Sequence, residues 1–142
     1  MYTESHLKHT HDSVVKLLFF YPFEGPLGSI FDSKYIDKLC RSLAMTYQTN
    51  FQIVDAPEEA FLPPMSIVSL EENRGTPLEE FEHPSKATYC FGNSNFPYPS
   101  EWCEPDHVVS IPVPNPEIPL YGMTAAAIVL HDRFIKQQRA TK

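Results

Sequence analysis

Polar, glycine-containing segments follow two apolar stretches in the last third of the chain. Gly92–Asn95 comes directly after Ala87–Phe91, which is predicted as a buried strand, and Pro114–Tyr121 comes after a second predicted strand, His107–Val113. Loops at the carboxyl ends of parallel strands form the usual ligand crevice in α/β sheets. A small-residue helix that begins near Gly122 would close this crevice, so the sequence predicts a binding site between the two loops.

Other reactive side chains show less organisation. His6, His9 and His11 have a spacing that suits a transition metal, but the polar segment around them offers no fold that would hold a coordination geometry. The three cysteines have no metal-ligand spacing, and their odd number is typical of reduced thiols in a cytosolic protein. Neither a G-x-S-x-G turn nor a G-x-x-x-x-G-K-[ST] loop occurs. We therefore predict no metal site and no hydrolase or P-loop site.

Apolar stretches alternate with segments of helical periodicity along the chain. An amphipathic helix is predicted from Asp32 or Ser33 to about Tyr47, and a shorter one from Pro77 to His83-Pro84. This alternation is typical of βαβ units and of a mostly parallel sheet. The predicted strands are Val14–Tyr21, Phe51–Val54, Met65–Leu70, Ala87–Phe91 and Val108–Val113.

Length and composition indicate one globular domain. The chain has 142 residues, of which 42% are hydrophobic and 20% charged. We expect a flexible N-terminus over residues 1–12 and a single three-layer α/β domain over residues 13–142. No apolar run approaches the ~20 residues that span a bilayer, and the start lacks a signal-peptide core, so a soluble, cytoplasmic protein is predicted. The net charge of −7 limits any nucleic-acid contact to a local basic patch.

The motifs of the last third resemble those of the SPOUT methyltransferases, the trefoil-knotted RNA methyltransferases, and most closely their SpoU-like branch. In that branch an F-G strand end precedes a strand ending in I-P-M and a helix start that reads S-L-N-x-S-x-A-x-A-I. This sequence has Phe91-Gly92, Ile111-Pro112-Val113 and Ala125-Ala126-Ala127-Ile128 in the same order and at the expected distances. The resemblance implies a C-terminal trefoil knot within residues 13–142.

The same resemblance implies a cofactor site. In the family, S-adenosylmethionine lies bent among three loops, which follow the F-G strand, follow the I-P strand and precede the last helix. Backbone groups make much of the contact. By position, the cofactor-binding residues would be Gly92, Ile111, Val113, Leu120 and Met123.

Several side chains of the family's active site are replaced in this chain. The carboxylate after F-G falls on Ser94, and the asparagine of the catalytic loop falls on Tyr121. The arginine of the first helix, which positions the ribose 2′-hydroxyl in the family, falls on Lys38, and a lysine supplies charge without the planar bidentate fork. The resemblance thus makes Lys38, Tyr121 and Ser94 the candidate catalytic residues, with Asn95 as a further positioning residue.

Two interpretations stay open. The chain is either an S-adenosylmethionine-dependent ribose 2′-O-methyltransferase of tRNA or rRNA with a diverged site, or a non-catalytic descendant that keeps the fold and works by binding. A 2′-hydroxyl is a poor nucleophile, so methyl transfer needs a base or strong positioning beside the sulfonium. No intact set of such side chains is visible, and the sequence does not name an RNA target.

The last helix also predicts a partner contact. It has an apolar stripe that includes Phe134 and a second apolar edge at Ile128 and Ile135. Two apolar edges on a terminal helix indicate contact with both a core and a partner. Because members of the resembled family dimerise through their first and last helices, we predict a homodimer.

Overall fold

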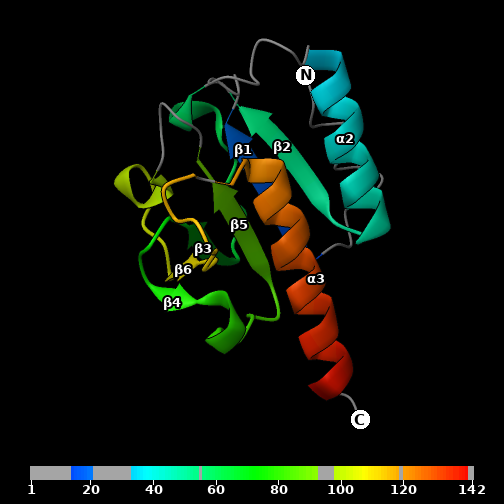
Figure 1. The fold of residues 1–142 in the computed structure, drawn as a ribbon. Coiled ribbons are helices and arrows are strands. Elements are labelled where there is room, and N and C mark those ends of the chain that lie inside the picture. The colour runs from blue at the N-terminus through cyan, green and yellow to red at the C-terminus, as the bar shows by residue number, and fades with distance from the viewer. Residues whose placement is uncertain (1–13, 21–32, 55, 93–97, 119, 141–142) are drawn as a thin grey trace.

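The structure is a computed structural model that describes residues 14–20, 33–54, 56–92, 98–118 and 120–140 (Figure 1). Strands, helices and short 3-10 turns alternate along the chain. In chain order the elements are β1 (Val15–Phe20), α2 (Ser33–Thr46), β2 (Asn50–Val54), η1 (Pro57–Glu59), β3 (Ser66–Leu70), β4 (Thr76–Pro77), η2 (Leu78–Glu80), β5 (Ala87–Phe91), η3 (Pro99–Glu101), β6 (His107–Ser110) and α3 (Gly122–Ala140).

The strands in the described ranges form one six-stranded sheet in which every pairing is parallel. Their order is β2-β1-β5-β3-β6-β4, so β5 lies in the interior between β1 and β3. Every residue of β1 and β5 is buried, as expected for parallel strands that are covered on both faces. The predicted α/β class and mostly parallel sheet are confirmed.

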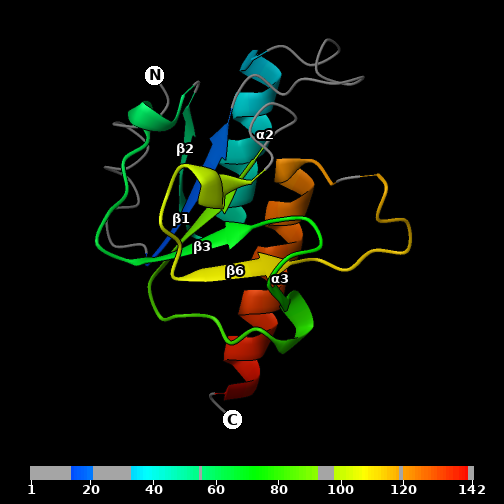
Figure 2. The ribbon, with the colours of Figure 1, turned by 90° about the vertical axis from the view of Figure 1, so that its left-hand side faces the viewer.

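Both long helices, α2 and α3, cover the same face of the sheet (Figures 1 and 2). Ile36 of α2 and Ala126 of α3 belong to one apolar cluster with the strand side chains of that face. A smaller cluster on the opposite face is covered by Ala60 and Trp102, which come from segments between strands. In the part of the chain that the structure describes, the third layer of the predicted three-layer fold therefore consists of short segments in place of long helices.

The region around β4 and β6 differs from the prediction. β6 ends at Ser110, before Ile111-Pro112-Val113, because the prolines there lack the N–H that ladder pairing needs. The helix predicted from Pro77 is wrong, since Thr76–Pro77 pair with Val109–Ser110 as β4 and only the 3-10 turn η2 follows. A proline is tolerated in β4 because this strand lies at the edge of the sheet.

The buried face of α3 also differs from the predicted stripe. Phe134, a predicted stripe residue, is 47% exposed, whereas its neighbour Arg133 is only 5% exposed. The residues that α3 buries are Gly122, Ala125, Ala126, Val129, Leu130 and Arg133. The small residues let the helix backbone lie close to the sheet, and the arginine is buried because it has polar partners there.

Those partners join α3 to β5 and to the segment before it. The Arg133 guanidinium donates hydrogen bonds to the carbonyl oxygens of Pro84 at 2.6 Å and Ser85 at 2.9 Å, and to the Tyr89 hydroxyl at 3.0 Å. Tyr89 itself is fully buried in β5. A buried hydroxyl without a partner costs about 1–3 kcal/mol, so this contact ties the position of α3 to the centre of the sheet.

His83 extends the same network. Its Nδ1 lies 2.7 Å from the Tyr89 hydroxyl, and its Nε2 lies 2.8 Å from Asp132 Oδ2 on α3. Lys136, one turn further along α3, donates to the same carboxylate oxygen at 2.9 Å. Burial lowers the pKa of the His83 imidazole below its ordinary value, and this effect outweighs the opposite influence of Asp132. Folding therefore favours the neutral form of the His83 imidazole.

This pKa shift predicts a pH-dependent stability. The unfolded state binds a proton at His83 more readily than the folded state. The contribution of His83 to the free energy of unfolding is therefore full above the unfolded pKa of about 6.5, and it is lost as the pH falls toward the lowered pKa of the folded state. Thermal unfolding followed by circular dichroism at pH 7.5 and 5.5 should show a smaller decrease in Tm for His83→Gln than for the unmodified chain. Thr124→Ala, at an exposed position on α3 without a titrating group, is the control and should keep the full decrease. An equal decrease in all three proteins would contradict the assignment.

Gly75 is required by the close approach of the turn before β4. Its φ is +77°, and an added Cβ would lie 2.1 Å from the Val108 carbonyl oxygen of β6. Gly75→Ala should therefore lower the free energy of unfolding by more than about 1 kcal/mol in urea denaturation. The control is Gly122→Ala, where the nearest atoms, on Phe19 and Phe91, lie at an ordinary 3.4 Å. Equal stability of the two variants would show that this turn does not need glycine.

Candidate functional site

The carboxyl ends of the parallel strands lie at one edge of the sheet, where the first turn of α3 lies against the ends of β1 and β5 (Figure 1). Gly92 follows β5 directly, and a Cβ built on Gly122 would lie 3.4 Å from Phe91 Cβ and 3.8 Å from the Gly92 carbonyl oxygen. The start of α3 therefore lies against the end of β5. The predicted juxtaposition of these segments is present in the structure.

The residues of the predicted cofactor cradle lie on the expected segments. Gly92, Ile111, Val113 and Met123 are half-buried, and Ile111 and Met123 pack against the same apolar cluster. Leu120 is 36% exposed and lies just before α3. The structure thus places a partly apolar, partly open wall between β5, β6 and the helix start.

Of the candidate catalytic residues, the structure describes Lys38 and Tyr121, which lie on different segments and make no hydrogen bond with each other. Lys38 is exposed on α2, between the buried residues Ile36 and Cys40. Tyr121 is 37% exposed before α3, where its carbonyl oxygen accepts the first helical hydrogen bond, from the Ala125 N–H. Ser94 and Asn95, the two candidates after β5, lie outside the described residues, as do His6, His9 and His11 of the N-terminal segment.

A buried carboxylate that sequence reasoning missed lies at the same sheet edge. Glu71 directly follows β3, its N–H donates to the Val109 carbonyl oxygen of β6 at 2.9 Å, and its side chain is 1% exposed. Its Oε2 accepts hydrogen bonds from Ser69 Oγ at 2.7 Å and from the Ser100 N–H at 2.9 Å. Glu71 therefore holds η3, which follows β5, against the end of β3.

Arg74 completes this cluster. Its Nη1 lies 3.5 Å from Glu71 Oε1, and its guanidinium lies over the Tyr98 ring at 3.7 Å from the ring centre. Burial alone would raise the pKa of the Glu71 carboxyl, but the hydrogen bonds from Ser100 and Ser69, together with the Arg74 charge, lower it below its usual range. The carboxylate is ionised at neutral pH. A carboxylate and an arginine three residues apart, directly after a predicted strand, were the available signal in the sequence.

A second buried charge lies on the face of the sheet that α2 and α3 do not cover. Lys16 of β1 is 1% exposed, and burial lowers the pKa of its ammonium group to about 8. The ammonium donates to Gln52 Oε1 at 2.8 Å and to the Phe61 carbonyl oxygen. Gln52 also accepts from the Phe61 N–H at 3.0 Å and donates to the Glu59 carbonyl oxygen at 3.0 Å. Lys16 and Gln52 thereby hold the segment around η1 on the sheet.

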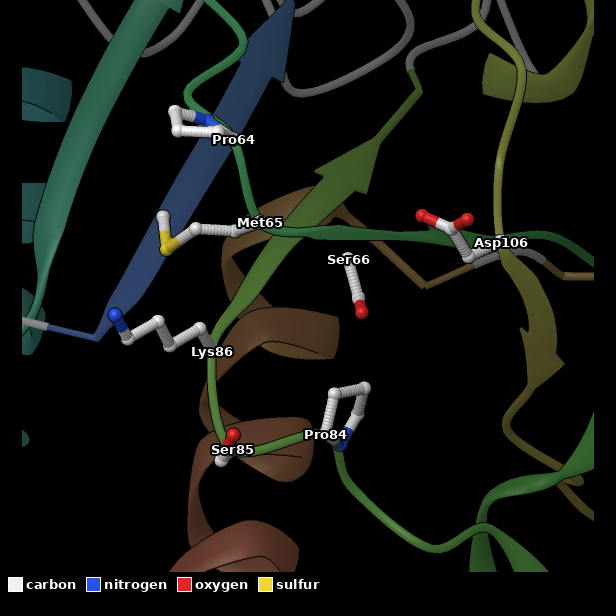
Figure 3. A pocket seen from close by; sticks show the side chains of 7 residues that line it. All are labelled: Pro64, Met65, Ser66, Pro84, Ser85, Lys86 and Asp106. Atoms are coloured by element: carbon white, nitrogen blue, oxygen red, sulfur yellow. The ribbon is translucent and has the colours of Figure 1, made fainter.

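A hollow of about 440 Å³ lies at the opposite edge of the sheet from the crevice, at the amino ends of β3 and β5 (Figure 3). Asp106 on its wall accepts a hydrogen bond from the Ile67 N–H at 2.8 Å. The lining residues are Pro64, Met65, Ser66, Pro84, Ser85, Lys86 and Asp106. The hollow contains none of the residues that the sequence predicts for the cofactor or for catalysis.

None of the helices in the described part of the chain combines the length and apolar character that crossing a membrane requires. The three cysteines are free, as predicted.

Solved structures are similar to this chain, although no protein-family model and no curated protein sequence matches it. The SpoU methyltransferase AviRb from Streptomyces viridochromogenes, solved in complex with the cofactor AdoMet, matches with a TM-score of 0.58 and 20% identity over 89% of this chain. The chain spans 61% of the length of AviRb. A structure described as giving insights into the 2-OH methylation of C/U34 on tRNA matches with a TM-score of 0.59 and 15% identity, over 87% of this chain and 96% of that one.

These likenesses concern the arrangement of the backbone, since the identities are only 20% and 15%. They agree with the order of strands and helices and with the motifs of the last third of the chain. The chain therefore has the α/β fold of the SpoU methyltransferases, as its motifs predicted.

Proposed function

We propose that this chain binds S-adenosylmethionine between the ends of β5 and β6 and the start of α3, and acts on RNA as a 2′-O-methyltransferase-like protein. The observation that carries the proposal is the close approach of Gly122 to Phe91 and Gly92, which brings the start of α3 against the end of β5, two of the three predicted cofactor segments. The fold shared with AviRb, a SpoU methyltransferase solved with AdoMet, supports it. A trefoil knot formed by the C-terminal part belongs to the same proposal.

The residues at the crevice fit the cofactor in kind. The half-buried side chains of Ile111, Val113 and Met123 offer apolar walls of the type that an adenine ring needs. Gly92 and the exposed rim at Leu120 leave the neighbouring backbone accessible to hydrogen-bonding groups. When bound, S-adenosylmethionine supplies a methyl group on a sulfonium centre, and the protein's part is to hold a nucleophile in line with it.

Methyl transfer needs catalytic side chains in addition to the cofactor-binding residues, and a chain without them would have a different function. Ribose 2′-O-methylation requires a group that positions or deprotonates the hydroxyl, and we propose Lys38, Ser94 and Tyr121, with Asn95, for this task. Lys38 is exposed on α2, and no hydrogen bond joins it to Tyr121 before α3 in the part of the chain that the structure describes. The replacement of the family's arginine, carboxylate and asparagine by Lys38, Ser94 and Tyr121 favours, as the second candidate function, a cofactor-binding protein that has lost methyl transfer, unless the lysine acts on the crevice of a second subunit.

A homodimer would meet that condition. The helices α2 and α3 lie side by side on one face, where Tyr47 and His131 contact each other at 3.1 Å. Both helices expose large apolar side chains: Met45 is 67% exposed on α2, and Ile128 and Phe134 are 37% and 47% exposed on α3. An apolar surface of this kind on two adjacent helices fits burial against a second copy. A cytoplasmic location remains a prediction of the sequence.

The cofactor proposal predicts a specific binding pattern. In calorimetric titration, S-adenosylmethionine and S-adenosylhomocysteine should bind with micromolar Kd values, and Gly92→Glu should abolish binding because its side chain fills the crevice. Lys38→Ala should leave the Kd unchanged and remove only methyl transfer to unfractionated tRNA, measured with a labelled methyl group. Gly92→Ala is the matched control and should bind with a smaller loss. Absence of binding to the unmodified chain would refute the proposal, and binding without methyl transfer would select the second function.

The dimer proposal predicts an oligomeric state that depends on α3. Multi-angle light scattering at micromolar concentration should give twice the 16.2 kDa mass of the chain. Replacing Ile128 and Phe134 together by glutamate should give the monomer mass, because both charges would be buried without partners. Ile118→Glu, at a position 66% exposed before α3, is the control and should stay dimeric. A monomer for the unmodified chain would exclude the homodimer.

A further inference from the structure

We infer that Arg74 positions a phosphate group of the RNA substrate at the rim of the crevice. This role rests on the proposed function, because it requires that RNA reaches this edge of the sheet. Arg74 is a positioning residue in this scheme and takes no part in proton transfer.

The first support is the placement of Arg74. Among the described lysines and arginines, it is the one that lies in the turn directly after the carboxyl end of a strand, between β3 and β4. Lys16 is buried within β1 and Lys86 precedes β5, at the opposite edge of the sheet. Arg74 therefore places a positive charge at the carboxyl edge of the sheet in a chain with a net charge of −7, in addition to Lys34 and Lys38 near the start of α2.

The second support is the way the guanidinium is held. One face lies over the Tyr98 ring, and Nη1 faces the Glu71 carboxylate, yet 51% of the side-chain surface remains exposed. The planar guanidinium can donate two parallel hydrogen bonds to a phosphate, which a lysine cannot. Tyr98 and Glu71 fix its plane, so little side-chain entropy is lost when the phosphate binds.

The third support is the rigidity of the turn itself. Asn73 and Gly75 both have positive φ values, +56° and +77°, and a Cβ added to Gly75 would lie 2.1 Å from the Val108 carbonyl oxygen of β6. Glu71, at the start of the turn, is fixed by its N–H bond to Val109 and by its buried carboxylate. The hydrogen bond between Glu71 and Ser100 is sufficient to hold η3 against the end of β3. The exposed Arg74 side chain is not needed for that contact.

Arg74 also compensates for a departure from the resembled family. Lys38 stands where the first-helix arginine is expected, and Lys38 is exposed on α2. Phosphate contacts fix the register and orientation of a nucleic acid on a protein, whereas they carry no sequence information. Arg74 would therefore determine how firmly and in what orientation RNA lies, and leave the choice of target to other residues.

The test is filter binding of unfractionated tRNA to the full chain across a series of salt concentrations. Arg74→Ala should weaken binding about tenfold at low salt and reduce the slope of log K against log salt by about 0.7–0.9, the value for one phosphate contact. Arg74→Lys should restore the slope but only part of the affinity, because the charge returns without the bidentate fork. Lys86→Ala, at the opposite edge, is the matched control and should leave both quantities unchanged. Thermal melting of each variant, with Arg74→Lys as the least disruptive, confirms that folding is retained.

The outcomes separate this inference from the proposed function. If the unmodified chain binds S-adenosylmethionine but Arg74→Ala binds tRNA with the same affinity and slope as Lys86→Ala, the role of Arg74 is overturned and the proposed function stands. Absence of tRNA binding by the unmodified chain overturns the role as well. If S-adenosylmethionine does not bind while the Arg74 variants change tRNA binding as expected, the methyltransferase-like function fails and a phosphate-contacting arginine remains.

Discussion

The buried hydroxyl of Tyr89 sets the constraint on which the arrangement of this fold depends. Tyr89 lies in β5, an interior strand, and a hydroxyl in that position must have hydrogen-bond partners within the protein. Arg133 and His83 provide them, and Arg133 also satisfies two carbonyl oxygens before β5. Because Arg133 belongs to α3, the same contact determines where the C-terminal helix crosses the sheet. The position of the helix start, and with it the crevice, follows from this buried polar group.

The crevice itself is held by two kinds of contact. Small residues bring the first turn of α3 against the end of β5, where Gly122 meets Phe91 and Gly92. The buried carboxylate of Glu71 draws η3 toward the end of β3. One contact acts through shape and the other through charge, and together they hold η3 and the start of α3 at the carboxyl edge of the sheet. Function is proposed for this edge because the fold brings these segments together from distant parts of the sequence.

Much of the architecture is predictable from the sequence because it follows from burial. The strands buried on both faces are nearly continuous apolar runs, and β1, β3 and β5 lie within one or two residues of their predicted bounds. β4 was not predictable, since two residues carry no periodicity and Pro77 argues for a helix start as readily as for an edge strand. The buried face of α3 was mispredicted because Arg133 reads as a surface residue until its carbonyl partners are known.

The same limit applies to the candidate site. Gly92, Ile111 and Met123 were predicted from their positions in motifs that resemble those of the SPOUT methyltransferases, and the structure places them after β5, after β6 and in the first turn of α3. The cluster of Glu71, Arg74 and Tyr98 was missed because its members come from two loops separated in the sequence, and only the folded sheet brings them together. Local sequence patterns predict helices and strands. Contacts between side chains of different loops depend on the order of the strands in the sheet, which such patterns do not give.

The two halves of α3 are attached to the sheet by contacts of different character. Directional hydrogen bonds from Arg133 and Lys136 fix the second half, while the first half rests on alanines and Gly122. Hydrogen bonds require a defined direction as well as a distance, whereas van der Waals contact depends on close packing alone. The direction of α3 is therefore set by its second half, and the distance between its first turn and the sheet is set by the small residues at Gly122, Ala125 and Ala126.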